Sequence, residues 1–96
     1  MKKLMTVVAT VMLVVHALAE SEVVDGVTWC YEIANGKATI VQGTMPCVGE
    51  MTVPETLGAC PVTAIGRSAF EKKKEILKMV LPAGITSIGG SAFASC

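Results

Sequence analysis

The sequence predicts a β-rich solenoid of 23-residue repeats that follows an N-terminal β-hairpin cap and is truncated within a repeat. Three observations predict it: a nonapeptide that occurs twice, an alternating segment with a tight turn, and a targeting segment at the start. They divide the chain into a signal peptide (1–19), a segment with the hairpin cap (20–49), and one atypical and one incomplete repeat (50–96).

The first 19 residues have the composition of a secretory signal peptide. Lys2 and Lys3 form a positive start, residues 4–15 are mostly apolar, and Ala17 and Ala19 place small residues where a signal peptidase cuts. An uncleaved membrane anchor is the alternative, but the apolar stretch is shorter than the ~20 residues that span a bilayer. We therefore expect a secreted or cell-surface protein, cut after Ala19, with no membrane span left after cleavage.

Composition and charge exclude several classes of protein. The chain is 52% apolar, with eight basic and eight acidic residues, which is too apolar and too weakly charged for a disordered polyelectrolyte. Because Lys2 and Lys3 leave with the signal peptide, the mature chain has six basic residues against eight acidic ones. Such a balance gives no attraction to nucleic acid. The length allows one small domain.

The cysteines indicate structure rather than chemistry. All four lie beyond the signal peptide, whereas the only histidine, His16, lies within it. Without CxxC spacing or histidine, zinc ligation and cysteine nucleophilic catalysis both lack their usual partners. The sequence also contains no phosphate loop and no activated serine context. We therefore expect no catalytic residue, no metal, no cofactor and no enzymatic activity in this segment. The cysteines are Cys30, Cys47, Cys60 and Cys96.

A hairpin is predicted over residues 27–42. Apolar residues alternate from Val27 to Ile33, which indicates a half-buried strand, and Asn35-Gly36 is a strong signal for a two-residue turn. That turn places Ala38 opposite Ile33. It places Ile40 opposite Tyr31, on the same apolar face. Trp29 and Tyr31 could stack on a ligand, but their period of two favours a place in the core. Residues 20–26 are acidic and are expected to be irregular.

The repeat is the most informative feature. Residues 62–70 recur as 85–93, with six of nine residues identical and a constant offset of 23. A period in the twenties is the length of a leucine-rich repeat, in which each unit forms one coil of a solenoid. Gly66 and Gly89 stand where the chain must turn, and a short helical turn after them brings one Phe from each coil into the core.

Two sets of residues follow from this frame. In the strands, residues alternate between the core and the outer face of the sheet. The predicted repeat core is Val53, Val62, Ile65, Phe70, Met79, Leu81, Ile85, Ile88 and Phe93. The outward strand positions, which are the candidate protein-contact residues, are Glu50, Thr52, Lys78 and Val80.

With these residues in place, the chain resembles the BspA-type leucine-rich repeats of secreted and surface proteins. That unit reads roughly Cys-x-x-Leu-x-x-Val-x-Ile-Pro followed by x-x-Val-Thr-x-Ile-Gly-x-x-Ala-Phe. Residues 79–93 match this frame, residues 53–70 match it one unit earlier, and the hairpin resembles the family's entry cap. The first unit departs from it: Lys73 replaces a Cys, and five extra residues, including Cys60, separate its Pro from its Val.

The resemblance has consequences for the cysteines. Cys96 stands at the family's Cys position, where it would pack as a small buried apolar residue and open a further strand. We therefore expect the sequence to stop within a repeat and to be a fragment of a longer repeat protein. One disulfide is then predicted among Cys30, Cys47 and Cys60, with the pairing open.

The resemblance also implies a function. BspA-type proteins are associated with adhesion to host cells, neighbouring cells and matrix proteins, so we expect a protein-binding module whose partner is a surface or matrix protein. The alternatives are an N-terminal appendage of a longer secreted enzyme and a small inhibitor-like protein stapled by disulfides. Residues 71–75 (Glu-Lys-Lys-Lys-Glu) could contact a polyanion, but the flanking glutamates favour a solvated face.

Overall fold

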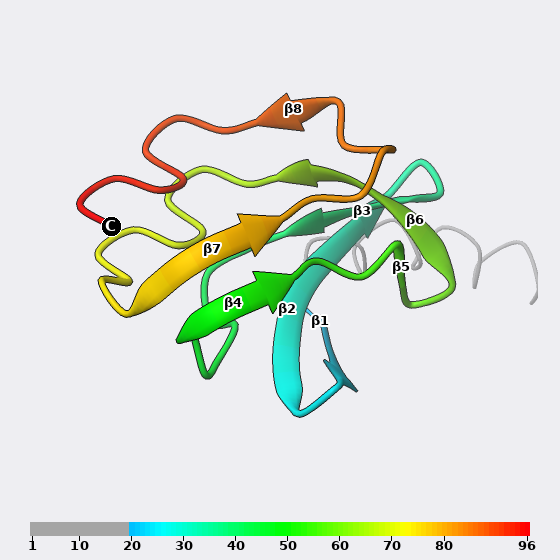
Figure 1. The fold of residues 1–96 in the computed structure, drawn as a ribbon. Coiled ribbons are helices and arrows are strands. Elements are labelled where there is room, and N and C mark those ends of the chain that lie inside the picture. Colours follow the sequence, from blue (N-terminus) through cyan, green and yellow to red (C-terminus); the bar gives the residue numbers. More distant parts are fainter. Residues whose placement is uncertain (1–19) are drawn as a thin grey trace, which may run out of the picture.

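Two facing β-sheets surround the core in the computed structural model, which describes residues 20–96 (Figure 1). One sheet has six strands in the order β1-β2-β3-β6-β5, with β8 also paired to β6, and the other consists of β4 and β7. The strands are β1 (Glu20–Val24), β2 (Val27–Ala34), β3 (Lys37–Ile40), β4 (Gly49–Thr52), β5 (Thr56–Leu57), β6 (Cys60–Ile65), β7 (Ile76–Val80) and β8 (Ser87–Ile88).

Three antiparallel strands form the N-terminal part of the larger sheet. The predicted hairpin is confirmed: β2 and β3 join through Asn35-Gly36, with Ile33 opposite Ala38 and Tyr31 opposite Ile40. The expectation that residues 20–26 are irregular is wrong. They form β1 and a tight turn at Asp25-Gly26, both with positive φ, so that the whole of β1 pairs with β2.

Strand β6 pairs with three other strands of the larger sheet. It is parallel to β3 on one side and to β8 on the other. Its first residues also form a short antiparallel pair with β5 around a turn at Gly58 and Ala59, both with positive φ. The five residues that separate the first unit from the family pattern are thus part of a hairpin rather than of a solenoid coil.

The two nonapeptides lie side by side in the same conformation. The amides of Ser68, Phe70 and Lys72 donate to the carbonyls of Gly90, Ala92 and Ala94 at 3.1, 2.8 and 2.8 Å. The intervening amides instead close successive tight turns within each copy. Positive φ occurs at the same places in both copies, at Ser68 and Ser91 and again at Lys72 and Ser95. The segment is therefore a chain of turns and not the short helix expected.

An aromatic column runs through the core. The rings of Trp29 and Phe70 meet edge to face at 6.3 Å, and those of Phe70 and Phe93 stack at 5.5 Å with 10° between their planes. Trp29 and Tyr31 are buried, so they belong to the core rather than to a ligand site. The column joins the hairpin to both copies of the nonapeptide.

Burial of the predicted repeat core falls from the first copy to the second. Val53, Val62, Ile65 and Phe70 are buried, whereas Met79, Leu81, Ile85 and Phe93 are half-buried. Ile88 is 50% exposed, so its assignment to the core is wrong. The reason is that β8 has a neighbouring strand, β6, on one side only.

The predicted leucine-rich-repeat solenoid is wrong as a fold class. The chain is a small β-rich domain of mixed strand order, in which the sheets curve into a nearly closed, barrel-like arrangement (Figure 1). The prediction extended the 23-residue period over the whole chain, but three of the strand pairs are antiparallel and join neighbouring segments. Two copies of a motif do not by themselves set the architecture.

The predicted signal peptide, residues 1–19, lies outside the described residues. Within 20–96, no helix is long and apolar enough to cross a membrane.

Candidate functional site

The four outward positions predicted from the sequence lie together on one exposed face. Strands β4 and β7 are parallel, with Glu50 opposite Lys78 and Thr52 opposite Val80. All four side chains are exposed, Val80 by 39%. Opposite charges at one end and a hydroxyl beside a valine at the other give this face both polar and apolar contacts.

A bulge in β7 adds an exposed leucine to this face. The register shifts between Gly49 and Glu50, so that Gly49 pairs with Ile76, Glu50 pairs with Lys78, and Leu77 has no partner across the pair. Leu77 is 83% exposed, the highest value among the exposed large apolar side chains that the structure describes. Bulges of this kind redirect a side chain away from the sheet. We call Glu50, Thr52, Leu77, Lys78 and Val80 the β4–β7 face.

The opposite side of the same strands holds the face in place. Met51 and Met79 lie opposite each other in register, and Met51 is buried. The amide of Val53 also donates to the carbonyl of Val80 at 2.9 Å, and Val53 is buried. The exposed residues therefore project from a sheet that is fixed to the core on its other side.

Sequence reasoning missed Leu77 because its exposure depends on the strand register. In the alternating frame, Leu77 precedes the strand that starts at Lys78, and nothing in the sequence marks a bulge. Met45 and Val48 were missed for a similar reason: both lie in the irregular loop before β4, and they are 62% and 48% exposed.

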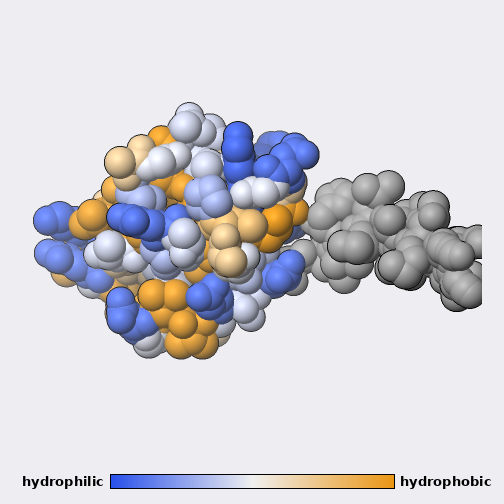
Figure 2. Space-filling view, turned by 90° about the vertical axis from the view of Figure 1, so that its right-hand side faces the viewer, coloured by the Kyte–Doolittle hydropathy of each residue, from blue (hydrophilic) through white to orange (hydrophobic). Residues whose placement is uncertain are grey.

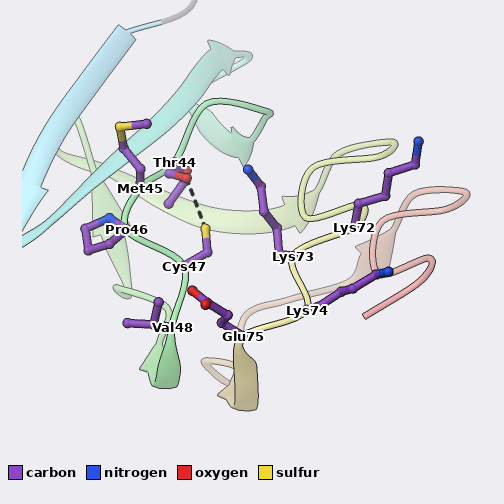
Figure 3. A pocket seen from close by; sticks show the side chains of 9 residues that line it. All are labelled: Thr44, Met45, Pro46, Cys47, Val48, Lys72, Lys73, Lys74 and Glu75. Atoms are coloured by element: carbon purple, nitrogen blue, oxygen red, sulfur yellow. Dashed lines mark hydrogen bonds between the residues drawn. The ribbon is translucent and has the colours of Figure 1, made fainter.

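A cleft of about 430 Å³ lies at the starting ends of β4 and β7 (Figure 3). One wall is the loop before β4 and the other is the segment before β7, held together by a 2.8 Å hydrogen bond from the Gly49 amide to the Glu75 carbonyl. Figure 3 shows the Lys72 and Lys74 side chains pointing away from the loop, and that of Glu75 pointing toward it. The lining residues are Thr44, Met45, Pro46, Cys47, Val48, Lys72, Lys73, Lys74 and Glu75.

The charge cluster at residues 71–75 is divided by this arrangement. Lys72, Lys74 and Glu75 are exposed, as expected of a solvated face, but Lys73 is half-buried and contributes to the cleft wall. With Glu75 in the same lining, the cleft is of mixed charge.

Cys47 lies in the cleft as a half-buried thiol. Its Sγ donates to the Thr44 carbonyl at 3.0 Å. Burial raises the pKa of the Cys47 thiol; the positive charge of Lys73 acts in the opposite direction, and Cys96 adds to the rise. A raised pKa lowers the fraction of the Cys47 thiol that is ionised at neutral pH.

The structure forms no disulfide among the cysteines of residues 20–96. Cys30, Cys47 and Cys60, predicted to hold one pair, are all free and half-buried. Cys96, expected to be buried, is exposed, and its Sγ donates to the Phe70 carbonyl at 3.1 Å. As for Ile88, no further layer covers it.

Within the described part of the chain, no group of three or more His, Cys, Asp or Glu side chains could hold a metal ion.

Figure 2 shows the face on the right-hand side of Figure 1, where apolar side chains form separate patches bordered by hydrophilic ones. The candidate site therefore rests on the shared register and exposure of the β4–β7 face.

Comparison with known proteins returned no match. Neither a scan against protein-family models nor searches of curated proteins and of solved structures found a similar protein. The resemblance to BspA-type repeats consequently stays a prediction from sequence motifs.

Proposed function

We propose that this protein is an exported protein-binding module that contacts a surface or matrix protein through the β4–β7 face. The observation that carries the proposal is the exposed Leu77 beside the in-register pairs Glu50–Lys78 and Thr52–Val80. Protein interfaces commonly have an apolar centre and a polar rim, and Leu77 beside Glu50 and Lys78 has this arrangement. The signal-peptide pattern supports export.

The size of the contact surface is consistent with a modest affinity. Two short strands alone provide less than the ~800 Å² per partner of a standard interface. The cleft extends the surface at one end, because Val48 and Glu75 line it and directly precede β4 and β7. A partner that laid an extended segment into this cleft while covering Leu77 would use both features.

Matched variants test the proposal. The purified protein is titrated onto plates coated with extracellular-matrix protein and onto intact cells. We expect Leu77→Asp to weaken binding at least about tenfold, because a carboxylate replaces an apolar anchor. The control is Val23→Asp, which makes the same kind of change at a residue that is 65% exposed on β1.

The outcomes test two parts of the proposal separately: the β4–β7 face as the contact surface, and adhesion as the function. Binding that is equal in L77D and wild type would show that the β4–β7 face is not the contact surface. If the folded wild-type protein bound none of the coated proteins or cells, the assignment as an adhesion module would be overturned. Circular dichroism confirms that both variants are folded.

A further inference from the structure

The second nonapeptide presents an open hydrogen-bonding edge. In the first copy, the carbonyls of Thr63 and Ile65 accept bonds from the amides of Thr86 and Gly89 at 2.8 and 2.7 Å. Its alternate amides, from Ser68 to Lys72, donate to the second copy. These bonds join the first copy to the second from Thr63 to Lys72.

The equivalent groups of the second copy face outward. They are the carbonyls of Thr86 and Ile88 and the amides of Ser91, Phe93 and Ser95, which we call the open edge. None of these three amides donates to a backbone carbonyl within residues 20–96. The side chains along the edge are also exposed or only half-buried, with Ile88 exposed by 50% and Phe93 half-buried. Like an unpaired strand edge, a row of backbone groups without partners can pair with another chain.

The order of groups along the open edge makes it complementary to itself. Its acceptors come first, at Thr86 and Ile88, and its donors come later, from Ser91 onward. When two such edges meet in opposite directions around a twofold axis, donors of one oppose acceptors of the other. With the axis between Gly90 and Ser91, the Phe93 amide faces the partner's Ile88 carbonyl, and the Ser95 amide faces the partner's Thr86 carbonyl.

Gly90 lies at the centre of this arrangement, and its surroundings also favour contact with a second molecule. The two copies approach closely at this corner: a Cβ on Gly89 would lie 2.6 Å from the Arg67 amide nitrogen. Gly90 itself has nothing within 4 Å of its Cβ position, and its φ lies outside the left-handed region. The first copy carries Arg67 at the same position, so neither backbone nor packing within the chain requires glycine here. The missing side chain leaves room at this corner for a second molecule to approach.

We propose that the open edge is a homodimer interface, in which a second copy of this chain pairs antiparallel around a twofold axis at Gly90. A twofold contact uses the same patch on both subunits, as the self-complementary order of donors and acceptors demands. The pairing also covers Ile88 and Phe93. It is distinct from the β4–β7 face, which stays free to bind a partner.

The test measures mass in solution. The protein, produced from the full sequence through the secretory pathway of an expression host, is examined by light scattering from about 10 µM to 1 mM, the range suited to a small interface. We expect a monomer–dimer equilibrium. Gly90→Arg, which restores the first copy's residue, should weaken dimerisation at least tenfold, whereas Ser21→Arg on β1, the opposite edge of the sheet, should leave it unchanged.

Hydrogen exchange locates the contact. Peptides covering residues 89–96 should exchange more slowly in the wild type than in G90R at the same concentration, with no difference in β1. A monomer throughout the concentration range would overturn the proposal. Dimerisation that is lost in S21R but kept in G90R would also overturn the proposal. So would oligomers that grow without limit with concentration. Both results would indicate that the open edge pairs with β1 of another copy.

Discussion

The two nonapeptides share six of nine residues and one backbone conformation, yet they differ in burial. Ile65 and Phe70 are 1% and 0% exposed, while Ile88 is 50% exposed and Phe93 is half-buried. Copy one is covered by β3 on one side and by copy two on the other, whereas copy two is covered on one side only. The same side chain therefore contributes more to stability in copy one, which has a layer on both sides, than in copy two, which has a layer on one side.

The phenylalanines should give the largest contrast between the copies. Phe70→Ala removes a ring packed between Trp29 and Phe93, and we expect it to cost about 3–5 kcal/mol, a large part of the stability of a small domain. Phe93→Ala removes one face of the same stack and should cost about half as much. Urea unfolding followed by tryptophan fluorescence measures both; equal losses would contradict the layer argument.

The isoleucines should repeat the contrast at a smaller scale. Ile65→Ala leaves a cavity in the centre of the sheet, with an expected loss of about 2–4 kcal/mol. Ile88→Ala should cost less than about 1 kcal/mol, because half of its surface already contacts water. The same urea titration compares them. A loss of more than 2 kcal/mol in I88A would mean that another molecule covers this residue.

Adjacent glycines sharpen the comparison at a single corner. An added methyl at Gly89 would meet the Arg67 backbone at 2.6–2.8 Å, so Gly89→Ala should cost about 1–3 kcal/mol. Gly90→Ala meets nothing and should be neutral, or stabilising by up to about 1 kcal/mol, because it restricts the unfolded chain. Thermal unfolding of the two variants in dilute solution checks this. Equal effects would show that the layers are not in close contact.

The smallest effect is expected from pH, and it concerns the hairpin beneath both copies. Burial raises the pKa of Tyr31 above its ordinary value of 10.0, with further increases from the charges of Glu20, Glu22 and Cys60. The unfolded chain therefore loses this proton first, and stability falls as the pH rises above about 10. Tyr31→Phe should remove part of that fall between pH 9 and 11, measured as the urea midpoint. An identical pH profile in Y31F would contradict it.

Local signals in the sequence were sufficient for the hairpin and for the inward and outward residues of β4 and β7. Asn35-Gly36 specifies a turn that fixes register, and alternation specifies faces, so both could be predicted without knowing the rest of the fold. Long-range features could not be predicted. The pairing of β1 depends on a β2 edge being free, and the exposure of Leu77 depends on a one-residue shift between strands far apart in sequence.

The fold class was predicted wrongly for a related reason. A repeated motif shows that two segments adopt one conformation, and the structure has them side by side. It does not show how many layers form or how the other strands close around them. The exposure of Ile88 and Cys96 follows from the number of layers, which no property of those residues reveals.

The pairing of β6 with three other strands has a consequence for how the chain acquires its structure. The β2–β3 hairpin involves neighbours in sequence and can form within microseconds, whereas β6 reaches β3 across more than 20 residues. The Gly66 amide then donates to the Ile40 carbonyl. In the next layer, the Gly89 amide donates to the Ile65 carbonyl. During synthesis the hairpin emerges before β6, so β6 meets a completed pair of strands. The order of translation is also the order of stacking.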